Sequence, residues 1–220
     1  MYLSRVALNT KRKNTMVALS SPQKIHAAVE NSFPPDAINK IRNLWRIDRL
    51  GKDLFLLVLS NVKPDFTHII EQFGWPESEQ KWETRDYSIL LERIKTGQRW
   101  QFRLLANPVH SVKQTDKLSP HEQTKRSKIY AHVTVKQQGK WLLDRAAKNG
   151  FSIQEGNFSV IHREVKKFRR HGKIVTLGIA TFEGILEVTD VTLFLRTLTN
   201  GIGRAKAYGC GMLTITGVSS

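Results

Sequence analysis

The residues from Asn200 to Leu213, N-G-I-G-R-A-K-A-Y-G-C-G-M-L, combine four glycines with Arg204 and Lys206. Glycine adopts backbone conformations that other residues avoid and allows another backbone to come close. Basic side chains in such a loop indicate a phosphate ligand. The loop precedes a predicted strand, M-L-T-I-T, and not a helix, which disfavours a dinucleotide or triphosphate site. A tight turn that caps the preceding helix is the alternative, but the two basic residues favour a polyphosphate backbone.

A second basic segment lies between His162 and Lys173, where Glu164 is the one acidic residue. Its basic residues are Arg163, Lys166, Lys167, Arg169, Arg170 and Lys173. Such a run alone is usually a solvated surface. Here it joins two predicted strands, residues 158–168 and 174–182, and alternate side chains of a protruding two-stranded ribbon can line a nucleic-acid groove. Few aromatic residues interleave the charges, so stacking on single-stranded bases is not the expected mode.

The net charge of the chain supports an anionic polymer as its partner. There are 35 Lys and Arg against 19 Asp and Glu, a formal net charge of +16 and a pI near 10.2. An excess of positive charge indicates which partners a protein associates with, but it does not indicate which fold the protein has. The longest apolar run, residues 54–59, is far shorter than the roughly 20 residues of a membrane span. We therefore expect binding to a duplex or stem-loop and no membrane partner.

The numbers and positions of the cysteines and histidines exclude several kinds of metal site and catalytic site. The single cysteine, Cys210, rules out an intramolecular disulfide and a cysteine-based zinc site, and it suits the cytoplasm. The seven histidines show no zincin spacing, and neither a carboxylate cluster for magnesium nor a G-x-S-x-G motif occurs. We expect no metal and no cofactor. His162 and His171 in the basic segment could contact phosphate, whereas His26 by default is an ordinary residue on a helix surface.

The first half of the chain has the element order of a ferredoxin-like unit. A helix is expected to begin at Ser21, with Pro22 in its first turn and His26 one turn later. Gly51 lies in a hairpin turn, and Gly74 ends a second helix. The predicted order is β-α-β-β-α-β within residues 1–96. The predicted elements are strands 2–8, 44–50, 54–60 and 87–94, the helix from 21, and helix 66–73.

The second half, residues 97–220, repeats this order in modified form. A polar, basic stretch at residues 111–128 is expected to be a loop, and Glu183-Gly184 is expected to interrupt a strand. The predicted elements are strands 100–105, 158–168, 174–182 and 186–188, helices 140–148 and 191–198, and a final strand after the glycine-rich loop. The sequence thus predicts an α+β fold of two tandem ferredoxin-like (RRM-like) domains, although no residue-level repeat relates them.

Four segments together resemble one known family. They are M-Y-L-S-R-V-A-L at the N-terminus, F-R-L-L-A-N-P at residues 102–108, F-E-G-I-L at 182–186, and the C-terminal glycine-rich loop. In this order, along the whole chain, they resemble the CasE family of CRISPR precursor-RNA endoribonucleases from type I-E Cascade complexes. The resemblance implies two ferredoxin-like domains, cleavage at the base of the repeat stem-loop, and retention of the product with other Cascade subunits.

The resemblance also implies a catalytic residue and a reaction. The family's catalytic histidine is matched by His26 in S-P-Q-K-I-H, but Gln23 stands where family members often carry a tyrosine, so that tyrosine's role does not transfer. The implied reaction needs no metal: the ribose 2′-hydroxyl attacks the adjacent phosphate and gives a 2′,3′-cyclic phosphate. His26 could act as acid or base. Gln23 and Lys24 are assisting candidates, and Glu30 could orient the ring or raise its pKa.

The sequence leaves two other functions open. One is a non-catalytic subunit that only holds the RNA hairpin, which the missing tyrosine favours and His26 opposes. The other is a DNA-binding protein, which is disfavoured because neither a helix-turn-helix nor a zinc-finger pattern occurs in the sequence.

Overall fold

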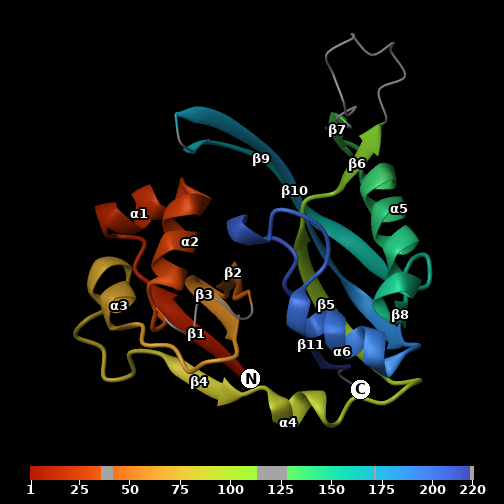
Figure 1. The fold of residues 1–220 in the computed structure, drawn as a ribbon, viewed down its shortest axis with the longest axis horizontal. Helices are drawn as coiled ribbons and strands as arrows, with labels where there is room; N and C mark the ends of the chain where they lie inside the picture. Colours follow the sequence, from red (N-terminus) through yellow and green to blue (C-terminus); the bar gives the residue numbers. More distant parts are fainter. Residues whose placement is uncertain (36–41, 113–127, 171, 219–220) are drawn as a thin grey trace.

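The computed structural model describes residues 1–35, 42–112, 128–170 and 172–218. Two antiparallel sheets lie side by side, each with helices against one face, and a long two-stranded ribbon rises from the second sheet (Figure 1). Both halves have the ferredoxin-like topology that the sequence predicted. The predicted boundary between residues 96 and 97 stays a prediction.

The first sheet has the strand order β2-β3-β1-β4, with every neighbour antiparallel. Its helices cover a core that includes Val6, Ile25, Val29, Leu56 and Phe66. The order is that of a ferredoxin-like unit. The elements are β1 (Tyr2–Leu8), α1 (Lys13–Leu19), α2 (Pro22–Glu30), β2 (Leu44–Leu50), β3 (Asp53–Ser60), α3 (Thr67–Phe73) and β4 (Glu83–Asp86).

Two differences from the sequence prediction occur in this half. The strand expected at 87–94 is wrong: β4 ends at Asp86, whose carboxylate accepts hydrogen bonds from the Ser88 backbone and hydroxyl at 2.9 and 2.6 Å. This local turn ends the strand and starts the short helix α4 (Ser88–Leu91). Helix α1 was not predicted. A long-range contact holds it, because the Thr15 hydroxyl donates to the Phe73 backbone oxygen at 3.0 Å.

The second sheet has the order β11-β5-β10-β8, with β9 also paired to β10. Helices α5 and α6 cover one face of it (Figure 1). The elements are β5 (Arg99–Ala106), β6 (Val109–Val112), β7 (Lys128–Ala131), α5 (Val135–Ala146), the 3-10 turn η1 (Ala147–Asn149), β8 (Phe151–Ser152), β9 (Phe158–Arg170), β10 (Lys173–Val188), α6 (Val191–Asn200), the 3-10 turn η2 (Lys206–Tyr208) and β11 (Leu213–Gly217).

Three boundaries in this half were wrong. The loop predicted at 111–128 carries the ends of the paired strands β6 and β7, and residues 113–127 lie outside the described residues. Helix α5 begins earlier than predicted because Thr134 and Gln137 form a capping box. Strand β10 runs unbroken through Gly184, where a Cβ would come within 2.2 Å of the Asn157 backbone oxygen. That glycine permits a close approach of two backbones and does not interrupt the strand.

One buried arginine joins the two halves. Arg46 on β2 is 2 % exposed and donates five hydrogen bonds, one for each guanidinium N–H. Two go to Asp48 at 2.7 and 2.6 Å. The others cross to the second half, reaching the backbone oxygens of Arg103 and Met212, both at 2.9 Å, and the Thr214 hydroxyl at 2.8 Å. The relative placement of the two sheets therefore depends on this side chain.

Candidate functional site

The glycine-rich loop connects α6 to β11 and packs against the first half of the chain. Its η2 turn contacts both α2 and β2, and Figure 1 shows it between the two halves. Gly209 has φ +81°, and a Cβ there would lie 2.7 Å from the Trp45 ring. Gly211 has φ +91°, and a Cβ there would lie 2.6 Å from the Ile202 backbone oxygen. Gly209 therefore allows the loop to pack on the first half, and Gly211 allows it to pack on its own backbone. This packing holds the η2 turn, which carries Lys206, against α2.

His26 projects from α2 toward this junction. Its side chain is about one third exposed, at 33 %, and its Nδ1 lies 3.7 Å from the Glu30 carboxylate one turn later. That Nδ1 is buried, and no described residue forms a hydrogen bond with it. Burial lowers the pKa of His26 below its usual 6.5, Glu30 opposes this shift, and the charges of Arg42 and Arg170 add to it. The neutral imidazole is therefore favoured at neutral pH.

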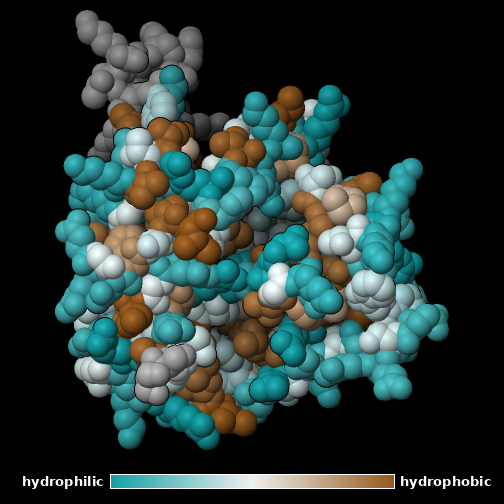
Figure 2. All heavy atoms as spheres, turned by 180° about the vertical axis from the view of Figure 1, so that it is seen from behind, coloured by the Kyte–Doolittle hydropathy of each residue, from teal (hydrophilic) through white to brown (hydrophobic). Residues whose placement is uncertain are grey.

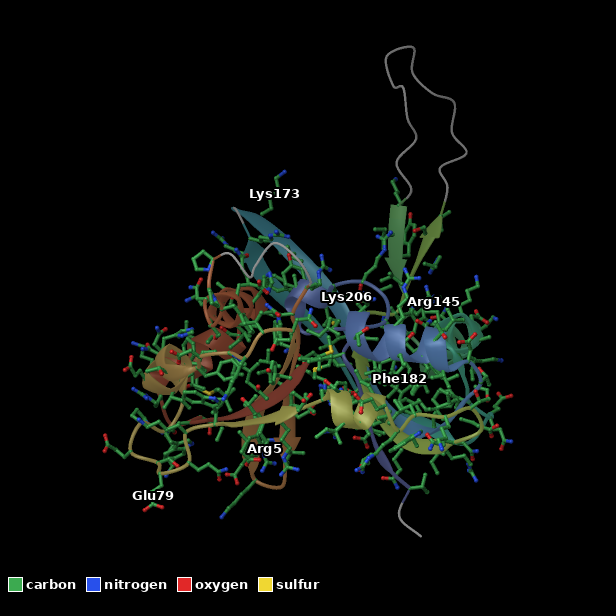
Figure 3. All side chains as sticks on the ribbon, turned by 60° about the horizontal axis from the view of Figure 1, so that its bottom comes forward. Arg5, Glu79, Arg145, Lys173, Phe182 and Lys206 are labelled. Atoms are coloured by element: carbon green, nitrogen blue, oxygen red, sulfur yellow. The ribbon has the colours of Figure 1, made fainter. Side chains whose placement is uncertain are left out.

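Two arginines from separate segments lie near His26, and one of them is also close to Lys206 on the η2 turn. Arg42 lies close enough to lower the pKa of both His26 and Lys206, although burial is the larger cause for each. Arg170 near the tip of β9 also acts on His26, and its Nη1 donates to the Tyr208 hydroxyl at 2.7 Å. Figure 3 shows Lys206 between the halves and Lys173 at the far end of the ribbon. A neutral imidazole among these cations suits a bound phosphodiester undergoing proton transfer.

The strand register divides the basic ribbon into two faces. Directly paired residues of antiparallel strands share a face, and alternate residues along a strand do so too. Phe168 and Leu177 are buried beside the glycine-rich loop, so their face points toward His26. This face of the ribbon, called the cleft face below, carries His162, Lys166, Arg170 and Lys173. The opposite face carries Arg163, Lys167 and Arg169. His171 lies outside the described residues.

The structure brings some of the predicted site residues together and separates others. Gln23 lies one turn before His26, and its buried Oε1 has no hydrogen-bond partner among the described residues. Lys24 is exposed and lines a different groove, with His68, on the far side of α2. Arg204 is exposed on the loop, and no contact links it to His26 among the described residues.

Sequence reasoning missed Arg42 and Tyr208. Tyr208 lies inside the loop that the sequence singled out, and its position directly before Gly209 was the available signal. Arg42 lies just before β2 in no recognisable motif, and only the fold brings it near α2.

Two kinds of feature are absent from the residues that the structure describes. No group of three His, Cys, Asp or Glu side chains in that part of the chain could hold a metal ion. No helix there has the length and apolar character needed to cross a bilayer.

Comparison with known proteins gives a consistent result. A family described as "CRISPR associated protein" matches residues 1–216. The CRISPR-associated endoribonuclease Cse3 of Thermus thermophilus is 27 % identical over 98 % of this chain and 99 % of its own length. The Cascade subunit CasE of Escherichia coli is 27 % identical over 56 % of this chain and 60 % of its own length.

A solved structure extends this similarity to three dimensions. Thermus thermophilus Cse3, bound to an RNA that represents a pre-cleavage complex, superimposes with a TM-score of 0.76 at 25 % identity over 98 % of both chains. The family match covers nearly the whole sequence, and the fold agrees with it. This chain belongs to the CasE family of CRISPR-associated proteins.

Proposed function

We propose that this protein is an endoribonuclease that cleaves CRISPR precursor RNA at the base of the repeat stem-loop and then retains the mature guide RNA within Cascade. One observation carries the proposal: a partly buried histidine on α2 lies near Arg42 and Arg170, and the η2 turn that carries Lys206 packs against the same helix. The names of the relatives, an endoribonuclease and a Cascade subunit, support it.

In the proposed reaction His26 acts as the general base. Its neutral imidazole takes the proton of the ribose 2′-hydroxyl, and the 2′-oxygen attacks the adjacent phosphorus. The bond from phosphorus to the 5′-oxygen breaks, which leaves a 2′,3′-cyclic phosphate and a 5′-hydroxyl. Lys206, which is half-buried and has a lowered pKa, is the candidate acid that protonates the departing 5′-oxygen.

The remaining groups bind and orient the substrate. The charges of Arg42 and Arg170 stabilise the negative charge that develops on the phosphate oxygens. Gln23 has an amide in place of the family tyrosine, so it can hydrogen-bond the phosphate but cannot exchange a proton with it. The basic ribbon holds the RNA stem through its phosphates.

The test is incubation of the pure protein with an end-labelled repeat RNA, followed by analysis of the product ends. We expect one cut at the stem base, with a 2′,3′-cyclic phosphate on the upstream fragment. Tight binding without cleavage would support the alternative, a subunit that only holds the hairpin. A product with a 5′-phosphate would contradict the proposed attack by the 2′-hydroxyl.

A further inference from the structure

A cavity of about 430 Å³ opens between the two halves, next to α2. Figure 2 shows the molecule hollowed between its two lobes, with hydrophobic and hydrophilic side chains around the hollow. Its volume falls in the range typical of small-ligand pockets, roughly 300–1,000 Å³. Apolar walls face each other across it, formed by Ile25, Trp45 and Leu54 from the first half and by Ile161, Ile179 and Tyr208 from the second.

The cavity adjoins the proposed catalytic residues. Pro22 lines it, and His26 lies four residues later on the same helix, so the two share a helix face. Tyr208 lines it from the other side while accepting the hydrogen bond from Arg170. A nucleotide attached to the phosphate at His26 would therefore reach the cavity with its base.

A β-bulge shapes one wall of the cavity. The pairing of β9 with β10 shifts between Thr181 and Phe182, so that Ile161 is the extra residue between the paired His162 and Val160. In a regular strand, consecutive side chains point to opposite faces. Here Ile161 and His162 are consecutive, and both line the cavity. Bulges re-aim side chains in this way beside functional sites.

The walls also carry groups that can form hydrogen bonds. His162 lines the cavity with a ring that is exposed and that can donate or accept a hydrogen bond. Glu164 lines the rim and lies 3.1 Å from the His162 Nε2 and 3.3 Å from the Lys166 Nζ. An occupant with a flat apolar face and a polar edge fits this surface.

We propose that this cavity binds the base of one unstacked nucleotide of the repeat RNA, adjacent to the scissile phosphate. The proposal rests on the proposed endoribonuclease function and adds a specificity subsite to it. Proteins read unpaired RNA bases by stacking them on aromatic side chains and hydrogen-bonding their edges. The cavity thus selects a cleavage site where the RNA can release one nucleobase from its stack, and it rejects the ends of other RNA stems that cannot do so.

The test compares abasic RNAs with the unmodified repeat. Each of the two nucleotides flanking the scissile phosphate is made abasic in turn, in RNAs whose attacking hydroxyl is replaced by hydrogen, so that affinity is measured without cleavage. With the wild-type protein, one abasic RNA should bind about tenfold more weakly than its parent, since stacking one base contributes about 1–3 kcal/mol.

Cavity variants show whether that penalty arises here. Ile161→Trp fills the cavity from the ribbon, and because Ile161 is 48 % exposed the fold should tolerate the change. Leu54→Trp fills it from the opposite wall. In both variants the abasic penalty should disappear. Val165→Trp is the matched control on the same strand, because Val165 is 64 % exposed and faces away from the cavity, so its penalty should persist.

Two outcomes would overturn the subsite. One is equal binding of both abasic RNAs and the parent RNA by the wild-type protein. The other is a penalty that persists in Ile161→Trp and Leu54→Trp. Neither bears on the proposed function, which the cleavage of unmodified RNA by the wild-type protein tests separately.

Discussion

The Arg46 Nη1 donates a hydrogen bond across the junction to the Met212 backbone oxygen, 2.9 Å away, and so fixes β2 against the strand that follows the glycine-rich loop. The same guanidinium forms a bidentate pair with Asp48. His26 belongs to the first half and Lys206 to the second, so their separation depends on this contact. Arg46 is a positioning residue, since it lies outside the cation cluster.

Replacing Arg46 should destabilise the protein. Arg46→Met leaves the buried Asp48 carboxylate without its main partner, and breaking a buried ion pair in this way costs about 3–5 kcal/mol. The free energy of unfolding, measured in urea, should fall by about that amount. Arg46→Met combined with Asp48→Leu should recover part of the loss, because no unpaired charge stays buried. A single variant as stable as the wild type would show that the pair does not hold the halves together.

Replacing His26 should separate catalysis from binding. His26→Ala removes the proposed base, so cleavage of the labelled repeat should fall by at least about 10²-fold. Hairpin affinity should hardly change, because the imidazole is neutral and contributes no charge to the phosphate contacts. Single-turnover cleavage and filter binding measure the two quantities. Wild-type cleavage by this variant would exclude His26 from the mechanism.

The pH dependence of His26 can be shifted in both directions. Glu30 raises its pKa and Arg42 lowers it, so Glu30→Gln should lower the pKa further and Arg42→Gln should raise it. If His26 is the base, the cleavage rate rises with pH through that pKa and falls again only at the higher pH where the acid, Lys206, loses its proton. The rising limb should lie below pH 6.5 in the wild type, at lower pH still in Glu30→Gln and at higher pH in Arg42→Gln.

The measurement is an NMR titration of the His26 ring in the free protein, beside the pH–rate profile. The two variants act as controls for each other, since each removes one charge near the same imidazole. Shifts in the same direction for both variants would contradict the electrostatic account. A rate that falls as His26 loses its proton would make it the general acid.

Replacing basic residues on the two faces of the ribbon should reduce the salt dependence of RNA binding, and the reductions from the two faces should add. Replacing both Arg169 and Arg170 with alanine should weaken RNA binding and flatten the plot of log K against log salt. Each lost phosphate contact should reduce the slope by roughly 0.7–0.9. Single variants would show which face contacts the RNA, because Arg170 faces the cleft and Arg169 the other side. Arg85→Ala is the control, since its side chain is 84 % exposed on the edge strand β4. An unchanged slope in the double variant would place both arginines in solvent.

The sequence predicted the topology of both halves because hydrophobic periodicity and turn residues are local signals. The missed features depend on distant parts of the chain or on brief local signals. Helix α1 relies on a bond from Thr15 to Phe73, and β4 ends because Asp86 caps the next turn. The bulge at Ile161 leaves no mark in a one-dimensional pattern.

The site was partly predictable for the same reason. His26, Lys206 and the ribbon arginines lie in segments whose composition stands out. Arg42 and Arg46 are isolated arginines in the sequence. The fold of the first half places Arg42 beside His26, and the docking of the two halves buries Arg46. The sequence predicts a phosphate-binding role for the glycines, but their geometry shows that they allow the loop to pack on Trp45 and on its own backbone.

The attacking oxygen should belong to the substrate. A repeat RNA with one 2′-deoxy substitution, just upstream of the scissile phosphate, lacks the proposed nucleophile but keeps every phosphate contact. It should bind with nearly the affinity of the unmodified RNA and resist cleavage, because hydrogen replaces the hydroxyl whose proton His26 would accept. The matched control carries the same substitution one nucleotide further upstream and should be cut normally.

The unmodified RNA should also be cut in EDTA, since this mechanism needs no metal-activated water. The cations around His26 supply the charge stabilisation that a metal would otherwise give, and their effect is largest where the bound phosphate is shielded from water. Cleavage of the substituted RNA, or complete loss of cleavage in EDTA with binding intact, would contradict this mechanism and indicate a metal-dependent hydrolase.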